Sequence, residues 1–420
     1  MKLLVTSDLH IGRIPSLPEG EPPLTGRSAW EAVVDCALEQ GVAALLLAGD
    51  AVEQDNAFFE ATGALLQGLE RLARAGIQVI AVAGNHDAKV FPRVARTCPA
   101  LTLLGEGGRW ETRVLGTGPE RLRLVGWSFP AAHHPGNPLA DFPTDLPADG
   151  LARLGLLHCD LEGPAASGYA PVPVRDLARA PIALWMLGHV HLPGPRAGAN
   201  AYYCGSPFAL DAAEEGPHGP WLLEVDPQGH LRQPLQLTLS PHQYRGLEVD
   251  LDGATGLAEV EDHIARTARE AGAGAAAEGL DGALHLKLRL TGRSALAGTL
   301  GPLLRDRLGS LSWTAQGLRV RVLTPVIDQT RPLLELAAKA LQPGPSGRLA
   351  QLLVRLEADP ADPEILGLLR DLEEADRLSF AAGAFGALPE RPLAASDLRD
   401  LLRLAGLRLL EALPAAGAER

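Results

Sequence analysis

Five apolar segments of this sequence each end at residues whose side chains can bind a metal ion. The residues at these ends are Asp8-Leu9-His10, Gly49-Asp50, Gly84-Asn85-His86-Asp87, His158 and Gly188-His189-Val190-His191. Oxygen donors from Asp and Asn, together with nitrogen donors from His, suit divalent first-row metals. If they converge, they form a two-metal site, for which the predicted ligands are Asp8, His10, Asp50, Asn85, His158, His189 and His191.

The apolar segments have the length and composition of strands that are buried on both faces of a parallel sheet. They cover residues 3–7, 42–48, 77–83, 154–157 and 182–187. In open α/β sheets, the carboxyl ends of such strands line one edge, and ligands bind there. We therefore expect the donor side chains to lie side by side at that edge.

Helical patterns separate the first three predicted strands. Ser28, followed three residues later by Glu31, predicts a capping box at the start of a helix that ends at Gly41. A second helix is predicted over residues 57–75. Right-handed crossovers then make the first three strands parallel neighbours. Two later apolar segments, residues 122–127 and 221–225, predict a second sheet packed on the first.

The chain is predicted to have three parts, with a metal-binding α/β domain at residues 1–235. A small α+β domain is expected at residues 240–325, where residues 284–290 and 318–322 alternate apolar and polar side chains. Such alternation predicts half-buried strands with one solvated face. The third part, residues 326–420, is predicted to be helical without strands. Its helices either pack on their own chain or present an apolar stripe to a partner.

Composition restricts the possible functions. The sequence has 38 basic and 51 acidic residues and a net charge of −13, which argues against a surface coated with basic groups for nucleic acid. A local DNA-binding patch stays possible, although an aromatic content of 4% makes sequence reading by base stacking improbable. The four cysteines form no closely spaced pair, which favours reduced thiols. No signal peptide or membrane span is predicted, so we expect a cytoplasmic protein.

Each motif taken singly has an ordinary structural explanation. An Asp after a strand can cap a loop, and a His there can be a hydrogen-bonded core residue. Their recurrence at five strand ends makes that explanation improbable for the set as a whole. Outside this context, the remaining histidines are predicted to lie on the surface in loops; they include His133, His134, His218 and His242.

This series of motifs resembles the calcineurin-like metallophosphoesterases, and more narrowly the SbcD-type DNA double-strand-break repair nucleases. The narrower resemblance rests on three segments: Ser7-Asp8-Leu9-His10-Ile11-Gly12, Tyr169-Ala170-Pro171 and Gly205-Ser206-Pro207. It implies an α/β (α+β) fold with a four-layer core, in which two packed mixed sheets are flanked by helices. A small α+β capping domain and a helical C-terminal tail would follow.

The resemblance also implies a role for each site residue. Asp8, His10 and His191 would hold one divalent ion, most often Mn2+ in this family. Asn85, His158 and His189 would hold the second, with Asp50 bridging the two ions. His86 would donate a proton or a hydrogen bond to the leaving oxygen. Asp87 would orient the His86 ring and stabilise its charged form.

The sequence departs from the family pattern at two positions. The family commonly has Gly-Asp-x-Phe-Asp where this chain has Gly49-Asp50-Ala51-Val52-Glu53. Cys159 stands where Gly often follows the ligand equivalent to His158. Neither change removes a predicted metal ligand, but either could alter the substrate groove.

The leading hypothesis is a metal-dependent DNA exo/endonuclease that acts in DNA repair with a coiled-coil ATPase of the SMC type, the SbcC-type partner. The resemblance also implies a possible homodimer. A second hypothesis is a metallophosphoesterase that acts on small-molecule or protein phosphates, because one fold serves many substrates. A third is a non-catalytic adaptor for the ATPase, although an adaptor would not need seven metal-binding side chains.

Overall fold

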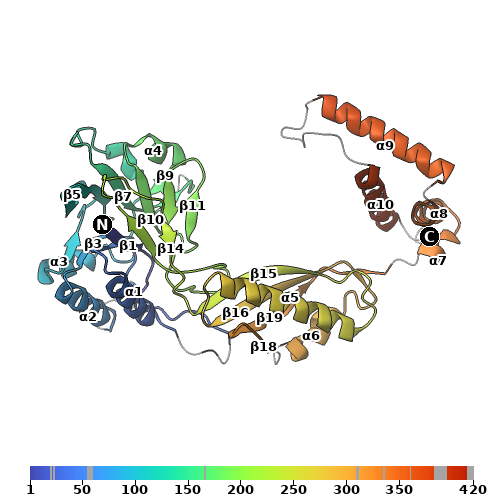
Figure 1. Cartoon of the computed structure of the whole chain (residues 1–420), viewed down its shortest axis with the longest axis horizontal. Coiled ribbons are helices and arrows are strands. Elements are labelled where there is room, and N and C mark those ends of the chain that lie inside the picture. Colours follow the sequence, from blue (N-terminus) through green and yellow to red (C-terminus); the bar gives the residue numbers. More distant parts are fainter. Residues whose placement is uncertain are drawn as a thin grey trace. The chain divides into compact units, whose positions relative to one another are not determined.

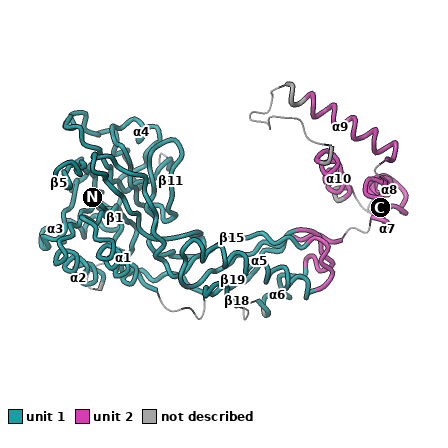
Figure 2. Tube along the Cα trace, in the orientation of Figure 1, with its two compact units in different colours: residues 1–251, 257–291, 299–329 teal, residues 252–256, 292–298, 330–420 magenta. Residues whose placement is uncertain are grey.

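The computed structural model describes most of the chain (Figure 1). The described residues are 1–18, 21, 24–53, 60–164, 167–308, 312–333, 336–359, 361–382 and 395–413. They form two compact units (Figure 2), and the first of these comprises residues 1–251, 257–291 and 299–329.

The first sheet has six strands, and its order across the sheet is β14-β13-β1-β2-β3-β4. In chain order these strands are β1 (Lys2–Thr6), β2 (Ala44–Ala48), β3 (Gln78–Val82), β4 (Leu101–Leu103), β13 (Trp221–Glu224) and β14 (Leu235–Gln236). β1, β2 and β3 are parallel neighbours, as the crossover rule predicts. The prediction that residues 221–225 belong to a second sheet is wrong, because β13 pairs antiparallel with β1 at the edge of the first.

Helices α1 (Gly26–Gln40), α2 (Glu60–Arg74) and α3 (Phe91–Thr97) connect these strands. The predicted capping box is displaced by one helical turn, since Thr25 is the N-cap and exchanges hydrogen bonds with Ser28. Gly41 ends α1 in the left-handed conformation, as predicted. Part of the second predicted helix, at residues 57–59, lies outside the described residues.

The second sheet also has six strands, ordered β11-β12-β10-β7-β6-β5. In chain order they are β5 (Trp110–Thr117), β6 (Glu120–Trp127), β7 (Ala152–His158), β10 (Leu184–Gly188), β11 (Gly194–Arg196) and β12 (Ala201–Tyr203). β7 and β10 are parallel, and Gly188 pairs with His158 at their carboxyl ends. This register places His189 beside His158. Shorter elements between these strands are η1 (Pro138–Asp141), β8 (Asp160–Leu161), β9 (Pro171–Val172) and α4 (Val174–Arg179).

The two sheets pack face to face through an apolar layer, to which each contributes alternate side chains. That layer includes Leu3, Val5 and Leu46 from the first sheet and Leu124, Leu156 and Met186 from the second. The opposite face of the first sheet packs on α1, α2 and α3, where Trp30, Leu65 and Phe91 are buried. The opposite face of the second sheet forms another cluster, which includes Trp185 and Leu177 of α4. The four-layer α/β architecture is therefore confirmed.

A four-stranded sheet with order β15-β16-β19-β18 completes the first unit. Its strands are β15 (His242–Asp250), β16 (Ala283–Thr291), β18 (Ser312–Ala315) and β19 (Leu318–Asp328), and its helices are α5 (Leu257–Ala277) and α6 (Leu300–Leu308). The apolar–polar alternation correctly predicts β16 and the first half of β19. The predicted absence of strands after residue 325 is wrong, since β19 continues to Asp328 and β20 (Arg331–Pro332) pairs with β17 (Arg293–Ser294).

The second unit comprises residues 252–256, 292–298 and 330–420 and is largely helical. Its helices are α7 (Leu336–Ala340), α8 (Pro345–Ala358), α9 (Pro363–Ala382) and α10 (Ala395–Ala412). They share a small core that includes Leu353, Leu356, Ile365 and Leu410. In the part of the chain that the structure describes, no helix combines the length and apolarity that crossing a membrane requires.

Candidate metal centre

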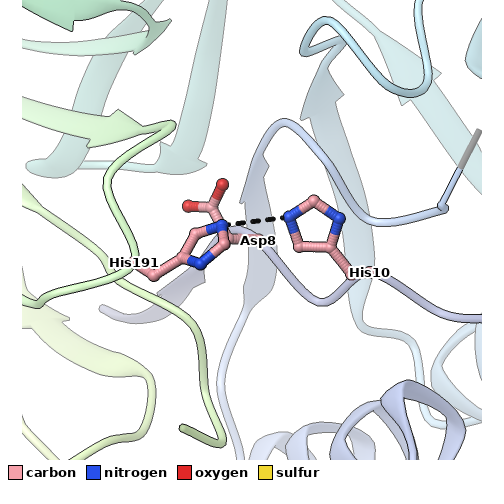
Figure 3. Close-up of side chains that lie close together, drawn as sticks. All are labelled: Asp8, His10 and His191. Atoms are coloured by element: carbon pink, nitrogen blue, oxygen red, sulfur yellow. Dashed lines mark hydrogen bonds between the residues drawn. The ribbon is translucent and has the colours of Figure 1, made fainter. Parts of the chain in front are cut away.

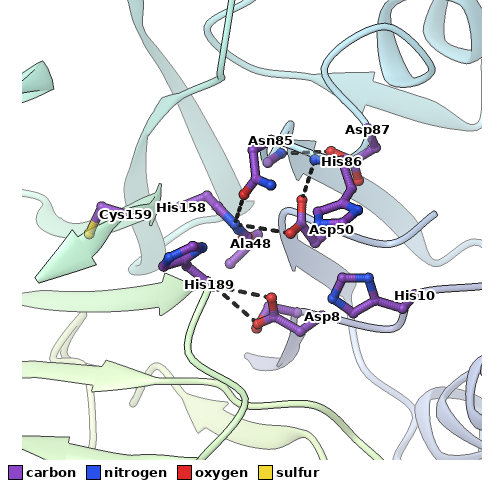
Figure 4. A network of polar contacts seen from close by, with 12 residues as sticks. Asp8, His10, Ala48, Asp50, Asn85, His86, Asp87, His158, Cys159 and His189 are labelled. Atoms are coloured by element: carbon purple, nitrogen blue, oxygen red, sulfur yellow. Dashed lines mark hydrogen bonds and ion pairs between the residues drawn. The ribbon is translucent and has the colours of Figure 1, made fainter. Parts of the chain in front are cut away.

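The carboxyl ends of β1, β2, β3, β7 and β10 bring the predicted donor residues together (Figure 4). His158 is the last residue of β7, and the other donors follow their strands within a few residues. Asp8, His10, Asp50 and His158 are almost completely buried, with at most 2% of their surface exposed. A group of acids and imidazoles so deeply buried requires compensation by partners or by a cation.

Glycines precede three of the donor residues because a side chain there would collide with another donor. A Cβ at Gly49 would lie 2.5 Å from Nδ1 of His158, and one at Gly84 would lie 2.1 Å from Oδ1 of Asp50. A Cβ at Gly188 would lie 2.1 Å from the Ala48 carbonyl oxygen and 2.6 Å from Nδ1 of His158. The Gly-Asp, Gly-Asn-His and Gly-His motifs are thus explained by close packing around the site.

Several donor residues also have strained backbones. Asp8, His10 and Asp50 have φ values of 51°, 45° and 52°, and His189 has a φ of 100°. Only three other described non-glycine residues have positive φ, namely Glu162, Ala170 and Gln316. Such conformations are unfavourable for residues with a Cβ and tend to cluster at functional sites.

The first donor cluster consists of Asp8, His10 and His191, whose ligand atoms all lie within 4.8 Å of one another (Figure 3). Nε2 of His10 and Nε2 of His191 are 3.2 Å apart. Nδ1 of His10 is 2.9 Å from Oε2 of Glu53, and Nδ1 of His191 is 2.7 Å from Oε1 of Glu214. Because a carboxylate only accepts, each Nδ1 carries the proton. In the neutral rings the two Nε2 lone pairs therefore face the same point.

The second donor cluster centres on His158. Its Nδ1 donates to the Ala48 carbonyl oxygen at 3.0 Å, so Nε2 of the neutral ring carries a lone pair. That Nε2 lies 3.1 Å from Oδ1 of Asn85 and 3.3 Å from Oδ2 of Asp50. Ligand atoms of Asp8, Asp50 and His158 again lie within 4.8 Å of one another. Asp8 therefore belongs to both clusters, whereas Asp50 belongs to the second.

The two clusters fit a pair of divalent cations. In each, electron-pair donors converge while the opposite ring nitrogen is fixed by an acceptor, which is how ligating histidines are commonly held. Such convergence is repulsive unless a cation or a proton occupies the centre. His189 is more peripheral: its backbone N–H donates to the Asp8 carboxylate at 3.1 and 3.2 Å. Its ring centroid lies 5.3 Å from that of His158.

His86 lies at the edge of the site, where 31% of its side chain is exposed. Its backbone N–H donates to Oδ1 of Asp50 at 2.9 Å, and its Nδ1 is 2.7 Å from Oε1 of Glu53. The prediction that Asp87 orients this ring is wrong, because Glu53 makes that contact. Asp87 is fully buried and accepts the N–H groups of Ala51 and Gly84, both at 2.7 Å. Asp87 therefore fixes the turn that carries Asp50 relative to the turn that carries Asn85.

The electrostatics keep two of the carboxyl groups ionised. Burial raises the pKa of Asp50, but His158 and other nearby imidazoles outweigh this effect and hold the pKa well below its ordinary value. Hydrogen bonds from His10 and His86 lower the pKa of Glu53 in the same way. Burial, together with the neighbouring Asp50 charge, instead raises the pKa of Asp87. Asp50 and Glu53 are therefore available as anions at neutral pH.

Sequence reasoning did not assign Glu53 or Glu214 to the site. Glu53 was noticed only as a departure from the Asp of the family pattern. Glu214 lies in a loop after the Gly205-Ser206-Pro207 segment, and no motif singles it out. The other departure, Cys159, is fully buried, and in Figure 4 its sulfur points away from the donor groups.

The predicted exposure of two of the remaining histidines is wrong. His218 and His242 were predicted to be surface residues, but they are 0% and 4% exposed. His218 Nδ1 lies 2.8 Å from the Ser206 carbonyl oxygen, and His242 belongs to β15. His133 and His134 are exposed and half-buried, respectively.

Comparison with known proteins agrees with this site. Residues 1–193 match the family model described as calcineurin-like phosphoesterase. The chain is 27% identical over 232 residues to a protein of Bacillus subtilis named uncharacterized metallophosphoesterase YhaO. This alignment covers 52% of the chain and 56% of that protein, so little more than half of the relative is matched.

Two solved structures align with part of the chain. A dimetal phosphatase from Danio rerio aligns at 13% identity with a TM-score of 0.35, covering 57% of this chain and 99% of that one. The nuclease MPE of Pseudomonas putida aligns at 16% identity with a TM-score of 0.24, covering 56% and 87%. Scores this low do not separate a phosphatase from a nuclease. The donor set lies within the region that matches the family model, so residues 1–193 are similar to calcineurin-like phosphoesterases in both sequence and site residues.

Proposed function

We propose that this protein is a metal-dependent nuclease that hydrolyses phosphodiester bonds of DNA in the cytoplasm. The observation that carries the proposal is the pair of adjoining donor clusters, which share Asp8. Two divalent ions held there, Mn2+ by family resemblance, would supply an acidified water as nucleophile and neutralise charge on the phosphate. The remaining groups of the mechanism belong to the chain itself.

His86 is the group that we assign to the leaving oxygen. It is partly exposed beside the clusters, and its Nδ1 is held by Glu53, so its Nε2 is free to face a substrate. The hydrogen bond to Glu53 raises the pKa of His86 more than burial lowers it. The ring can thus hold a proton at Nε2 and donate it as the phosphorus–oxygen bond breaks. Glu53 orients the ring and remains ionised throughout.

An exposed aromatic side chain beside the site favours a nucleotide substrate. Tyr169 is 36% exposed, and its ring centroid lies 5.3 Å from that of His189 and 5.7 Å from that of His133. A nucleobase of any type can stack on such an aromatic ring, so the contact does not depend on the nucleotide sequence. A phosphatase for simple phosphomonoesters would have no use for this surface.

The proposed partner is a coiled-coil ATPase of the SMC type, and its docking site would lie on the helical second unit. Several leucines of α9 and α10 are exposed there, including Leu378, Leu401, Leu404 and Leu409. Single exposed leucines are common on protein surfaces, so the support for a docking site comes from the number of exposed leucines on these two helices. Adding the ATPase is expected to increase DNA cleavage by the purified chain.

The test is a cleavage assay with purified full-length protein, Mn2+ and end-labelled linear duplex or single-stranded DNA. We expect nucleotides to be released, and His86→Ala to reduce this by at least about 100-fold, because it removes the general acid. Mn2+ binding, measured by calorimetry, should be unchanged in this variant. The control is His230→Ala, since the His230 side chain is 78% exposed and lies outside both donor clusters.

The competing functions predict different outcomes. Turnover of cyclic nucleotides or aryl phosphates without DNA cleavage would replace the nuclease with a small-molecule phosphoesterase. Mn2+ binding without turnover of any substrate, combined with capture of the ATPase, would favour the adaptor.

A further inference from the structure

Glu214 contacts a predicted metal ligand, and the proposed mechanism gives Glu214 no role. It lies in the loop after β12, and only 7% of its surface is exposed. Oε1 is 2.7 Å from Nδ1 of His191. Oε2 accepts the backbone N–H of Leu210 at 2.7 Å and the hydroxyl of Ser206 at 3.0 Å. Both oxygens of this carboxylate therefore accept hydrogen bonds, Oε1 from one donor and Oε2 from two.

We propose that Glu214 is a positioning residue that fixes His191 in the Nδ1–H tautomer, so that its Nε2 lone pair would be available to hold the first cation. The proposal rests on the metal centre of the proposed function, but not on its substrate. The His191 ring has two nitrogens and, when neutral, one proton. Whichever nitrogen faces Glu214 must donate, so the other is left as the metal ligand.

The contacts of Oε2 show why a carboxylate is required there. The Leu210 N–H can only donate, so in a Glu214→Gln variant the single amide oxygen is drawn to Leu210. The amide nitrogen then faces Nδ1 of His191 and donates to it. The ring must move its proton to Nε2, which lies 3.2 Å from Nε2 of His10. A proton would then occupy the position from which His191 binds the cation.

The experiment measures Mn2+ binding to the full-length protein by titration calorimetry, without any substrate. Ligand-orienting groups of this kind typically contribute 10- to 100-fold in metal affinity. We therefore expect Glu214→Gln to weaken one Mn2+ site by about 10- to 100-fold. The matched control is Glu215→Gln, because the Glu215 carboxylate faces Lys287 and the backbone N–H of Gly246. That variant should bind Mn2+ as the wild type does.

A double-mutant comparison separates positioning from a general structural role. In a His191→Ala background, Glu214→Gln should cause no further loss of Mn2+ affinity, because the ring that it orients is absent. A further loss there, or wild-type affinity in the single variant, would overturn the proposal.

A direct measurement on the wild type guards against a variant that fails to fold. Nitrogen NMR of histidine-labelled protein in EDTA, with His191→Ala used for assignment, reports which ring nitrogen is protonated. We expect the Nδ1–H form, and a predominant Nε2–H form would refute the inference. None of these readouts involves DNA, so failure of the nuclease assay would leave the inference standing.

Discussion

At the scale of single residues, the three imidazoles of the two donor clusters are each held by an oxygen acceptor at Nδ1. Glu53, Glu214 and the Ala48 carbonyl oxygen hold His10, His191 and His158, respectively. The arrangement sets the ring orientations before a cation arrives. Pre-organisation of this kind strengthens metal binding, because the ligands lose little freedom when they bind.

Glu53 differs from the other two acceptors because it contacts two rings at once. Oε2 is paired with His10, and Oε1 is paired with His86. In Glu53→Gln only one oxygen is left to accept, so one of the rings must change its tautomer. We expect about 10-fold weaker Mn2+ binding or more, together with a lower kcat when Mn2+ is saturating. His86→Ala should lower kcat alone.

Calorimetry and steady-state kinetics with any substrate that the wild type cleaves test this prediction. At saturating Mn2+, the Glu53→Gln/His86→Ala double variant should have the kcat of His86→Ala, because the ring that Glu53 orients is missing. Equal Mn2+ affinity and kcat in Glu53→Gln and the wild type would show that the bridging contact has no functional role.

At the scale of elements, the sequence predicts the strand ends well because three signals coincide there. These are a metal-binding residue type, an apolar segment of strand length before it and, at three of the ends, a glycine directly before the donor residue. It does not predict which sheet a short strand joins, since β13 has the same apolar pattern as the strands of both sheets. Nor does it predict Glu214, because its contacts with His191 depend on loop geometry that no periodicity encodes. Asp87 was assigned by proximity in sequence, whereas its carboxylate points toward backbone N–H groups and not toward the neighbouring ring.

Burial of isolated polar residues is equally hard to predict. His285 alternates with apolar residues in its strand, which predicts a solvated face, and His242 is predicted to lie on the surface in a loop. Both are buried, and Nδ1 of His242 lies 3.9 Å from Oε2 of Glu21. Glu21 is more than 200 residues away from either histidine in the sequence. Contacts between distant segments leave no periodic signal within either strand.

The packing of α1 on α2 gives an element-scale prediction. A Cβ at Gly68 would lie 2.2 Å from Nε1 of Trp30, whose indole N–H donates to the Ala64 carbonyl oxygen at 3.1 Å. Trp30 is fully buried, so it has little room to move. Gly68→Ala should therefore destabilise the domain by about 1–3 kcal/mol through overpacking.

Gly63 in the same helix supplies the matched control. No atom lies within 4 Å of a Cβ built there, and alanine is the better helix former. Gly63→Ala should stabilise the domain by about 0.5–1 kcal/mol. Urea unfolding followed by tryptophan fluorescence compares the two variants with the wild type. A stabilising effect of Gly68→Ala would mean that the two helices do not approach as closely as described.

At the scale of the whole molecule, a polar cluster joins Glu21 of the N-terminal α/β domain to the β15–β16–β19 sheet. Glu21 accepts from Arg319 at 2.9 Å and from Arg321 at 3.0 Å. Beside it, Nδ1 of His242 and Nε2 of His285 are 2.9 Å apart in rings only 10° from parallel. A single proton lies between these nitrogens, so the geometry describes a neutral hydrogen-bonded pair and not two ligands directed at one cation.

This cluster predicts how stability depends on pH. The pKa of His285 is lowered to about 4, chiefly by burial. The neighbouring His242 and the charges of Arg321 and Arg319 lower it further, although Glu21 opposes them. In the unfolded chain its pKa is near 6.5, so the unfolded state binds more protons between pH 6.5 and 4. The stability contributed by neutral His285 is complete above pH 6.5 and is lost as the pH falls toward 4. The loss from this residue is at most about 3 kcal/mol.

Replacing the ring isolates its contribution from those of other titrating groups. His285→Gln keeps a polar side chain but does not titrate, so its unfolding free energy should fall less steeply than that of the wild type between pH 6.5 and 4. Above pH 6.5 the two curves should run parallel, with a constant offset from the lost hydrogen bond to His242. Urea unfolding at several pH values, in EDTA so that the metal ligands behave alike in both proteins, measures the difference. Parallel curves over the whole range would show that His285 titrates in the folded protein as it does in the unfolded chain, and the cluster would then be open to water.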